Sequence, residues 1–183
     1  MLAAASVFSA LMAPAPASAS ERPLTLQAGG GVRIFNSQLA LHDNVSLGLR
    51  MGLGMTDRLS LALDYVFSSP VRETSNYIAY VSALRGLIRF DLLAGRTRPY
   101  LIAGLGGVQF NFNDARDYST GTLTVGYGLS RRIGPRRTLG LEATADVYRN
   151  RVEQFSVTGD LIGYGPRSYQ GMGTISASVG IEF

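Results

Sequence analysis

The chain has 183 residues, enough for one domain, and it is 46% apolar and only 16% charged. Its formal net charge of +4 would suit nucleic acid, but the arginines are scattered and form no patch with interleaved aromatic residues, which argues against that partner. Cysteine is absent, which excludes disulfide bonds, thiolate catalysis and cysteine-ligated metal sites.

The chain begins with a segment typical of a secretory signal peptide. Residues 2–12 are apolar but too few to anchor in a bilayer, and Pro14 and Pro16 follow directly. Ala17 and Ala19 fit the A-x-A pattern of signal peptidase, which predicts cleavage after Ala19. We therefore expect a signal peptide at 1–19 and a single outer-membrane β-barrel domain at 20–183.

After this segment, apolar and polar residues alternate with the period of a β-strand that has two different faces. The alternation is strictest near the N-terminus. The stretch 100–112 is rich in glycine, and its facing is ambiguous because a bulge near Gly106 and Gly107 would switch it. We expect eight strands, at 24–34, 45–55, 59–67, 78–90, 100–112, 122–130, 139–147 and 174–183.

The connections between these strands alternate in length, which is the layout of an outer-membrane barrel. Short turns are expected around Asp57, at 94–96 and at 134–136. Longer loops are expected at 36–44, 68–77, 113–121 and 149–173. The fold class predicted is all-β, an eight-stranded antiparallel up-and-down transmembrane β-barrel with both termini on the periplasmic side.

The last loop is the longest, and its residues Val152, Phe155 and Val157 stand at near-strand spacing. This spacing predicts that the seventh strand projects above the membrane as an exposed hairpin, where strand addition could bind another chain.

The polar face of the strands is mostly Gly, Ser and Thr, with a few arginines and acids. A soluble barrel would need a lysine- and glutamate-rich face toward water, so this face instead suits a narrow barrel interior and the apolar face suits lipid. Aromatic residues near the strand ends predict two interfacial girdles. They are Phe35, Tyr65, Phe67 and Tyr80 toward the long loops, and Phe90, Tyr100 and Phe183 toward the short turns.

Two motifs resemble those of small bacterial outer-membrane barrels of the OmpA/OmpX type. The C-terminal Phe183, preceded by alternating Ala177, Val179 and Ile181, resembles the assembly signal of outer-membrane proteins. Residues 99–106 read PYLIAGLG and resemble the PYxxAGxG stretch of the fifth strand. The resemblance implies the fold, an outer-membrane location and recognition by the barrel-assembly machinery, with no peptidoglycan-binding domain expected after the barrel. Members of this family include structural proteins, adhesins and narrow pores.

Eight charged residues are expected to face the lumen as a charge network: Arg33, Arg50, Asp64, Arg85, Arg89, Glu142, Asp146 and Glu182. Charges buried in so narrow a space must be paired or hydrogen-bonded. Either a gated narrow pore or a salt-bridged plug would result, and the plug is favoured because eight strands leave room only for side chains.

Two other groups of residues leave alternatives open. His42 and Asp43 could join Ser37, Ser68 or Ser69 in a lipid A-modifying acyltransferase or deacylase, or His42 could be an ordinary loop histidine. Four arginines crowd the third short turn and could bind phospholipid headgroups or simply be solvated. They are Arg131, Arg132, Arg136 and Arg137.

The function expected is that of a non-enzymatic integral outer-membrane protein with a structural or adhesin-like surface-binding role. The alternatives are the lipid A-modifying enzyme and a narrow solute pore. We assign no catalytic, metal or cofactor-binding residue and expect no cofactor. The partners expected are outer-membrane lipids and lipopolysaccharide, the barrel-assembly machinery and a surface ligand held by the long loops. We expect a monomer that binds no nucleic acid.

Overall fold

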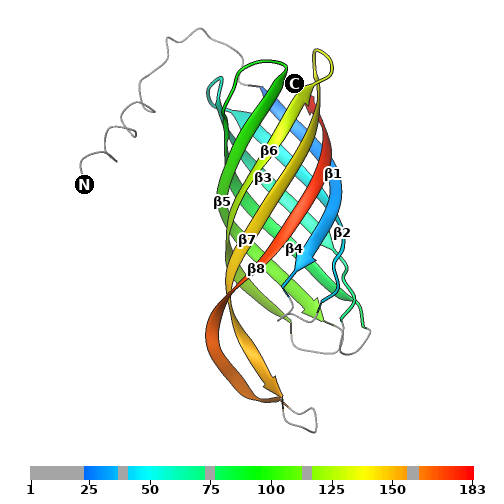
Figure 1. Ribbon diagram of the computed structural model, residues 1–183, viewed down its shortest axis with the longest axis vertical. Helices are drawn as coiled ribbons and strands as arrows, with labels where there is room; N and C mark the ends of the chain where they lie inside the picture. Colours follow the sequence, from blue (N-terminus) through cyan, green and yellow to red (C-terminus); the bar gives the residue numbers. More distant parts are fainter. Residues whose placement is uncertain (1–22, 37–40, 73–76, 113–116, 156–160) are drawn as a thin grey trace, which may run out of the picture.

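Eight antiparallel strands form one closed barrel, each strand pairing with the next in the chain and the last with the first (Figure 1). The structure, a computed structural model, describes residues 23–36, 41–72, 77–112, 117–155 and 161–183, and at 150–168 only the backbone. The strands are β1 (Leu24–Phe35), β2 (Asn44–Gly54), β3 (Leu59–Ser68), β4 (Ala79–Asp91), β5 (Thr97–Phe112), β6 (Tyr118–Arg132), β7 (Arg137–Phe155) and β8 (Leu161–Glu182). The predicted eight-stranded antiparallel barrel is confirmed.

The barrel closes where β1 pairs with β8, so that Leu26 lies opposite Met51 of β2 on one side and Ile181 of β8 on the other. Closure leaves the paired part of the sheet without a free edge. Gly31 of β1 is required here, because a Cβ on this residue would overlap the carbonyl oxygen of Ile175 in β8. In the part of the chain described, no helix is both long and apolar enough to cross a membrane.

The two ends of the barrel differ. One end, which we call the turn end, holds the turns 55–58, 92–96 and 133–136 together with the start of β1 and the C-terminus (Figure 1). Gly95 takes a φ of 135° in the second of these turns, a conformation that suits glycine. The opposite end, the loop end, holds the other four connections. Two of these connections, 113–117 and 156–160, are shorter than predicted, because β6, β7 and β8 extend beyond their predicted ends.

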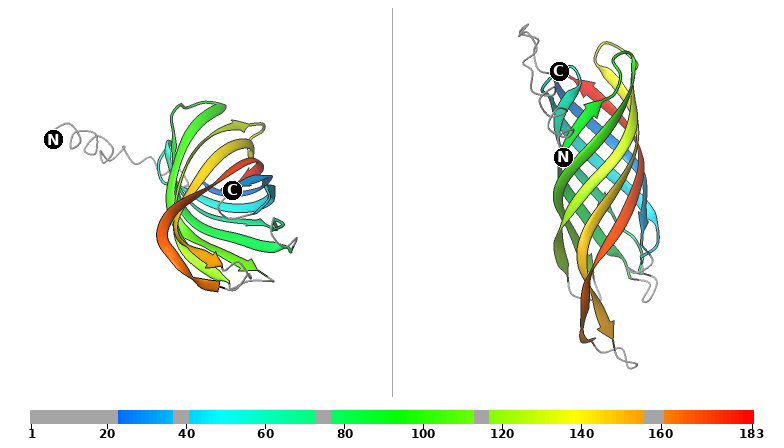
Figure 2. Two further views of the ribbon diagram at one scale, coloured as in Figure 1. Left: turned by 60° about the horizontal axis from the view of Figure 1, so that its bottom comes forward. Right: turned by 60° about the vertical axis from the view of Figure 1, so that its left-hand side comes forward.

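The β7–β8 hairpin projects well beyond the other strands at the loop end (Figures 1 and 2). The pairing of β8 with β1 ends at Met172 and Phe35, and that of β7 with β6 ends at Tyr148 and Thr122. Beyond these residues β7 and β8 pair with each other as far as Phe155, with register shifts after Arg151 and Gln154. The hairpin predicted from the spacing at 149–173 is therefore present in the backbone.

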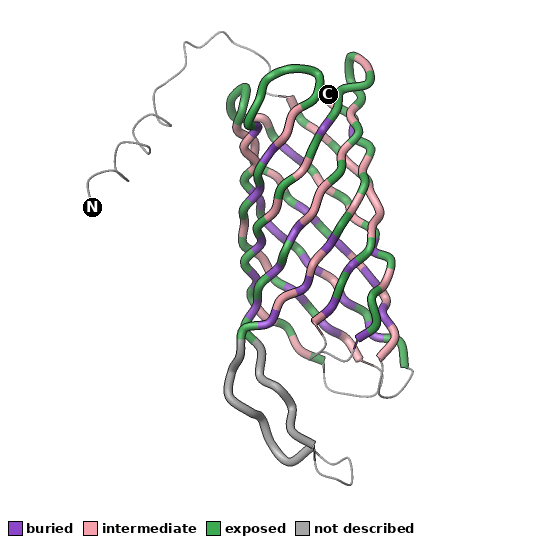
Figure 3. The backbone as a smooth tube through the Cα atoms, in the orientation of Figure 1, coloured by how far each residue is buried: buried purple, intermediate pink, exposed green. Residues whose placement is uncertain are grey.

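Burial alternates along the strands where it is described (Figure 3). Most of the exposed large side chains on the outer wall are apolar. Leu47, Leu105 and Leu141 are more than 60% exposed on the outer wall. In β5 the odd residues face outward and the even ones inward, without any register shift, so the bulge considered near Gly106 and Gly107 is absent.

Two aromatic residues assigned to the girdles lie inside the barrel instead. Phe35 and Tyr100 are 8% and 3% exposed. Phe35 follows outward-facing Ile34, so alternation turns it inward, and Tyr100 is an even residue of β5. By contrast, Tyr65, Tyr80 and Phe183 are exposed on the outer wall as predicted.

Candidate functional site

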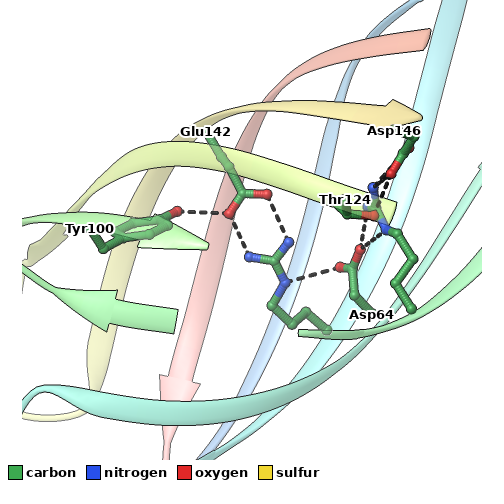
Figure 4. A network of polar contacts seen from close by, with 7 residues as sticks. Asp64, Tyr100, Thr124, Glu142 and Asp146 are labelled. Carbon is green, nitrogen blue, oxygen red and sulfur yellow. Dashed lines mark hydrogen bonds and ion pairs between the residues drawn. The ribbon is translucent and has the colours of Figure 1, made fainter. Parts of the chain in front are cut away.

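The centre of the barrel is crossed by a chain of charged and polar side chains from six strands (Figure 4). We call this set the central network. Its members, in order of contact, are Tyr100 of β5, Glu142 of β7, Arg50 of β2, Asp64 of β3, Arg85 of β4, Asp146 of β7 and Thr124 of β6. Because β2, β3 and β4 lie across the lumen from β7, the network ties opposite walls together.

Arg50 is the bridge in the half of the network nearer the turn end. Its two terminal nitrogens donate to the two carboxylate oxygens of Glu142 at 2.6 and 2.7 Å, and its Nε donates to Asp64 at 3.0 Å. The hydroxyl of Tyr100 donates to Glu142 at 2.9 Å. A bidentate arginine–carboxylate pair of this kind is among the strongest polar contacts in proteins.

Arg85 is the second bridge. Its Nε donates to Asp64 at 3.0 Å, a further nitrogen contacts the same carboxylate, and Nη1 lies 3.0 Å from both oxygens of Asp146. Thr124 donates to Asp146 at 2.6 Å. Arg85 and Asp146 are almost completely buried, so the cost of desolvating each ion has to be offset by these contacts.

Arg33 completes the charge balance of this layer. It is completely buried, its Nη1 lies 3.5 Å from the hydroxyl oxygen of Ser68, and it is close enough to Asp146 and Asp64 for electrostatic attraction. Three arginines (Arg33, Arg50 and Arg85) therefore face three carboxylates (Asp64, Glu142 and Asp146) in the middle of the barrel.

The lumen near the turn end holds a cavity of about 140 Å³, lined by charged residues together with apolar ones. Asp91 on its wall accepts from Arg89 at 2.7 Å and from Arg98 at 3.4 Å. Arg89 also donates to Ser130 at 2.7 Å, and its guanidinium lies 3.8 Å above the ring of Tyr100. Arg50 of the central network also lines this cavity, so the cavity adjoins the network.

The lumen near the loop end is filled by apolar side chains, which we call the apolar plug. Its buried members are Phe35, Leu41, Ala79, Val81, Ala83, Val108, Phe110, Tyr148 and Met172, with Phe112 and Tyr118 packed against them. Phe110 is completely buried, and its ring lies 4.6 Å from that of Tyr118 and 5.6 Å from that of Tyr148, measured between centroids. Packing of this kind excludes water from the interior.

The eight charged residues predicted for the lumen lie in separate groups. Five of them make up the ionic part of the central network, and Arg33 lies beside it without a direct ion pair. Arg89 pairs with Asp91, and Glu182 pairs with Arg132 at 3.1 Å near the turn end. Asp91, Arg98 and Tyr100 were not among the charged residues predicted for the lumen. The sequence did indicate an inward direction for Asp91, because it lies two residues after Arg89 on the same strand.

The apolar plug was not predicted at all. The sequence feature that indicates it is a change of residue type on the inward face near the strand ends. Large apolar residues stand there, whereas glycine, serine and threonine are common elsewhere on that face: Phe35, Val81, Phe110 and Met172. Without the facing of β5, the sequence did not show that these residues converge.

Three of the residues considered for a lipid A-modifying active site have other contacts. The carboxylate of Asp43 accepts the backbone N–H of Phe35 at 3.0 Å. Ser68 is buried inside the barrel against Arg33. Ser69 accepts a hydrogen bond from Asn44 through its carbonyl oxygen. Ser37 and the predicted cleavage residues Ala17 and Ala19 lie outside the described residues.

Three residues of the predicted assembly signal lie on the closing strand β8, and the fourth, Phe183, follows directly after it. Ala177, Val179, Ile181 and Phe183 are all exposed on the outer wall, and the N–H of Phe183 donates to the carbonyl oxygen of Leu24 at 2.9 Å. The predicted signal therefore coincides with the segment that joins β8 to β1.

Comparison with known proteins identifies the architecture. No protein-family model and no curated protein matches the sequence. Neisserial surface protein A is a solved structure that aligns with a TM-score of 0.68 at 18% identity, covering 87% of this chain and 97% of its own. The N-terminal β-barrel domain of Pseudomonas aeruginosa OprF aligns with a TM-score of 0.56 at 19% identity, covering 88% and 98%. Ail, the attachment invasion locus protein of Yersinia pestis, aligns at 0.52 and 14%, covering 90% and 100%. The chain therefore has the fold of the small eight-stranded outer-membrane β-barrels of the OmpA/OmpX type.

Proposed function

We propose that this protein is an integral outer-membrane scaffold whose barrel does not conduct and whose projecting β7–β8 hairpin binds a ligand at the cell surface. The observation that carries this proposal is the filling of the lumen by two successive layers, the central network and the apolar plug, while one hairpin extends far beyond the barrel.

Insertion in a membrane is supported by the inverted distribution of side chains. The outer wall is covered by large exposed apolar residues, including Leu47, Leu105 and Ile175, whereas the ions lie inside. A water-soluble protein exposes no apolar surface of this extent, while a closed barrel satisfies its backbone internally, as a bilayer requires. The turn end then faces the periplasm, and the loop end faces the outside.

A role without transport is supported by the nature of the two layers. The central network joins opposite walls through ion pairs whose members are mostly buried, so opening a path would separate desolvated charges at a cost of several kcal/mol each. The apolar plug would have to be displaced as well, because Val81 and Phe110 are completely buried in it.

Binding by the hairpin is supported by its free backbone edge. From Leu161 to Gly171, the described part of β8 has no β1 partner, because the pairing with β1 ends at Met172. An extended segment of another protein could add to this edge as a further strand. Ail, a protein with the same fold, carries attachment in its name, and we place an adhesive role of this chain in the hairpin.

The topology is tested with trypsin added to intact cells that express the protein. We expect cleavage at the arginines of the hairpin, which are Arg149, Arg151 and Arg167, and a protected barrel fragment. Cleavage that requires a permeabilised outer membrane would place the hairpin in the periplasm and contradict the proposal.

The adhesive role is tested by replacing residues 150–168 with a two-residue Asn-Gly turn, which suits a hairpin. We expect the variant to fold and to lose adherence of the cells to surfaces coated with extracellular matrix protein. The matched control replaces the connection 113–117 and should retain adherence. Equal adherence of the hairpin variant and the wild type would show that the hairpin has no such role.

A further inference from the structure

The outer wall carries an apolar groove of about 580 Å³ across β6, β7, β8 and β1, which we call the wall groove. Two rows of paired outward residues form it. The first row is Arg131, Leu139, Val179 and Ala28. The second row is Leu129, Leu141, Ala177 and Gly30. A volume of this size is within the range of about 300–1,000 Å³ found for sites of small ligands.

The groove is deep where its residues are small. Ala28, Gly30 and Ala177 form its floor on β1 and β8. Larger residues of the neighbouring rows border this floor, with Ile181 on the side of the turn end and Ile175 on the side of the loop end. The lining is almost entirely apolar, so the groove suits a hydrocarbon chain.

The groove rises from the turn end toward the middle of the barrel. Arg131 is the last residue but one of β6 at the turn end, whereas Ala28 is the fifth residue of β1 counted from the same end. Rows that cross tilted strands are inclined to the membrane. The wall groove therefore spans the half of the bilayer that adjoins the turn end.

Two arginines lie where this groove reaches the turn end, and both face outward. Alternation along β6 and β7 turns Arg131 and Arg137 to the outside, beside Leu139 and Ile181. Arg131 and Arg137 are the charged residues among the described outward positions of the strands in this half of the barrel. No described side chain forms an ion pair with either guanidinium. Arg132, between them in sequence, points inward and pairs with Glu182.

We propose that the wall groove binds one anionic phospholipid of the periplasmic leaflet, with an acyl chain over Ala28, Gly30 and Ala177 and the phosphate between Arg131 and Arg137. The proposal rests on the membrane insertion argued above. Charge complementarity carries it, because guanidinium groups bind phosphate well and basic residues at a membrane surface attract anionic lipid. Lipopolysaccharide belongs to the opposite leaflet and would meet the other end of the barrel.

The test compares the retention of two lipids with identical acyl chains, phosphatidylglycerol and phosphatidylcholine, by native mass spectrometry of the full chain released from mixed nanodiscs. We expect the wild type to retain phosphatidylglycerol preferentially, by roughly fivefold for each arginine at the interface. The double variant R131Q/R137Q should lose this preference, and the matched control R132Q should keep it. Ala177→Phe, which fills the floor from the outside, should reduce retention of both lipids.

Equal retention of the two lipids by the wild type would overturn the headgroup part of the proposal, as would a loss in R132Q as large as in the double variant. Unchanged retention in Ala177→Phe would overturn the placement of the acyl chain. Heat-modifiable gel mobility in vesicles is measured for every variant. A wild type that does not fold into vesicles contradicts the proposed membrane insertion instead, so the two failures are distinguishable.

Discussion

Replacement of Arg50 by Met tests how the interior is held together. Arg50 makes two contacts to Glu142 and one to Asp64. After the replacement, Asp64 still has Arg85, but Glu142 keeps only the hydroxyl of Tyr100. Leaving one member of a buried ion pair without its partner costs about 3–5 kcal/mol, so we expect R50M to lower the free energy of unfolding by roughly that amount.

A second substitution distinguishes the two carboxylates. In R50M/E142Q the unpaired charge is removed, the remaining ions balance, and the introduced amide oxygen can still accept from Tyr100, so we expect recovery of roughly half of the loss. R50M/D64N restores the same net charge, but it leaves Glu142 without a cation and takes from Arg85 one of its two carboxylates. This control should recover less.

The free energies are measured by urea unfolding in lipid vesicles and linear extrapolation. Circular dichroism is the suitable probe because the chain contains no tryptophan. A cost below about 1 kcal/mol for R50M, the range of an exposed ion pair, would refute the view that these charges are desolvated. Equal recovery by D64N and E142Q would refute the contact pattern.

Three further predictions concern other parts of the barrel. Gly31→Ala should prevent closure of β1 on β8, whereas Gly30→Ala should be tolerated because the added Cβ would lie 3.5 Å from its nearest neighbour atom. The folded fraction on heat-modifiable gels distinguishes the two variants. Tyr100→Phe should cost about 1.5–3 kcal/mol in urea unfolding, since it removes a hydrogen bond to the charged Glu142, and a change below about 0.5 kcal/mol would contradict that bond. Deletion of Phe183 should reduce the amount of assembled barrel in cells, while Phe183→Tyr should assemble normally; normal assembly of the deletion would count against the signal.

The strand order, the two faces and the positions of the short turns could be predicted because alternation is a local property of the sequence. The exact strand ends could not, since the spacing at 149–173 indicates a projecting hairpin but not how far β7 and β8 pair with each other. The facing of β5 was ambiguous because glycine carries no face preference, and its neighbours β4 and β6 fix it through the register.

The charged residues of the lumen could be identified from parity, but their partners could not. The pairing of Arg50 with Glu142 joins β2 to β7 across the barrel, a relation that depends on strand tilt and stagger rather than on spacing. The apolar plug depends in the same way on residues from five strands and from the 36–43 connection meeting at one level.

Conductance of the purified full-length barrel in planar lipid bilayers tests the central claim most directly. Folding into the same lipid is verified first by heat-modifiable mobility, so that silence is not a failure of insertion. Because the central network and the apolar plug occupy the lumen one after the other, we predict little or no steady current. Large and stable single-channel currents from the wild type would contradict the blocked lumen and establish the protein as a pore.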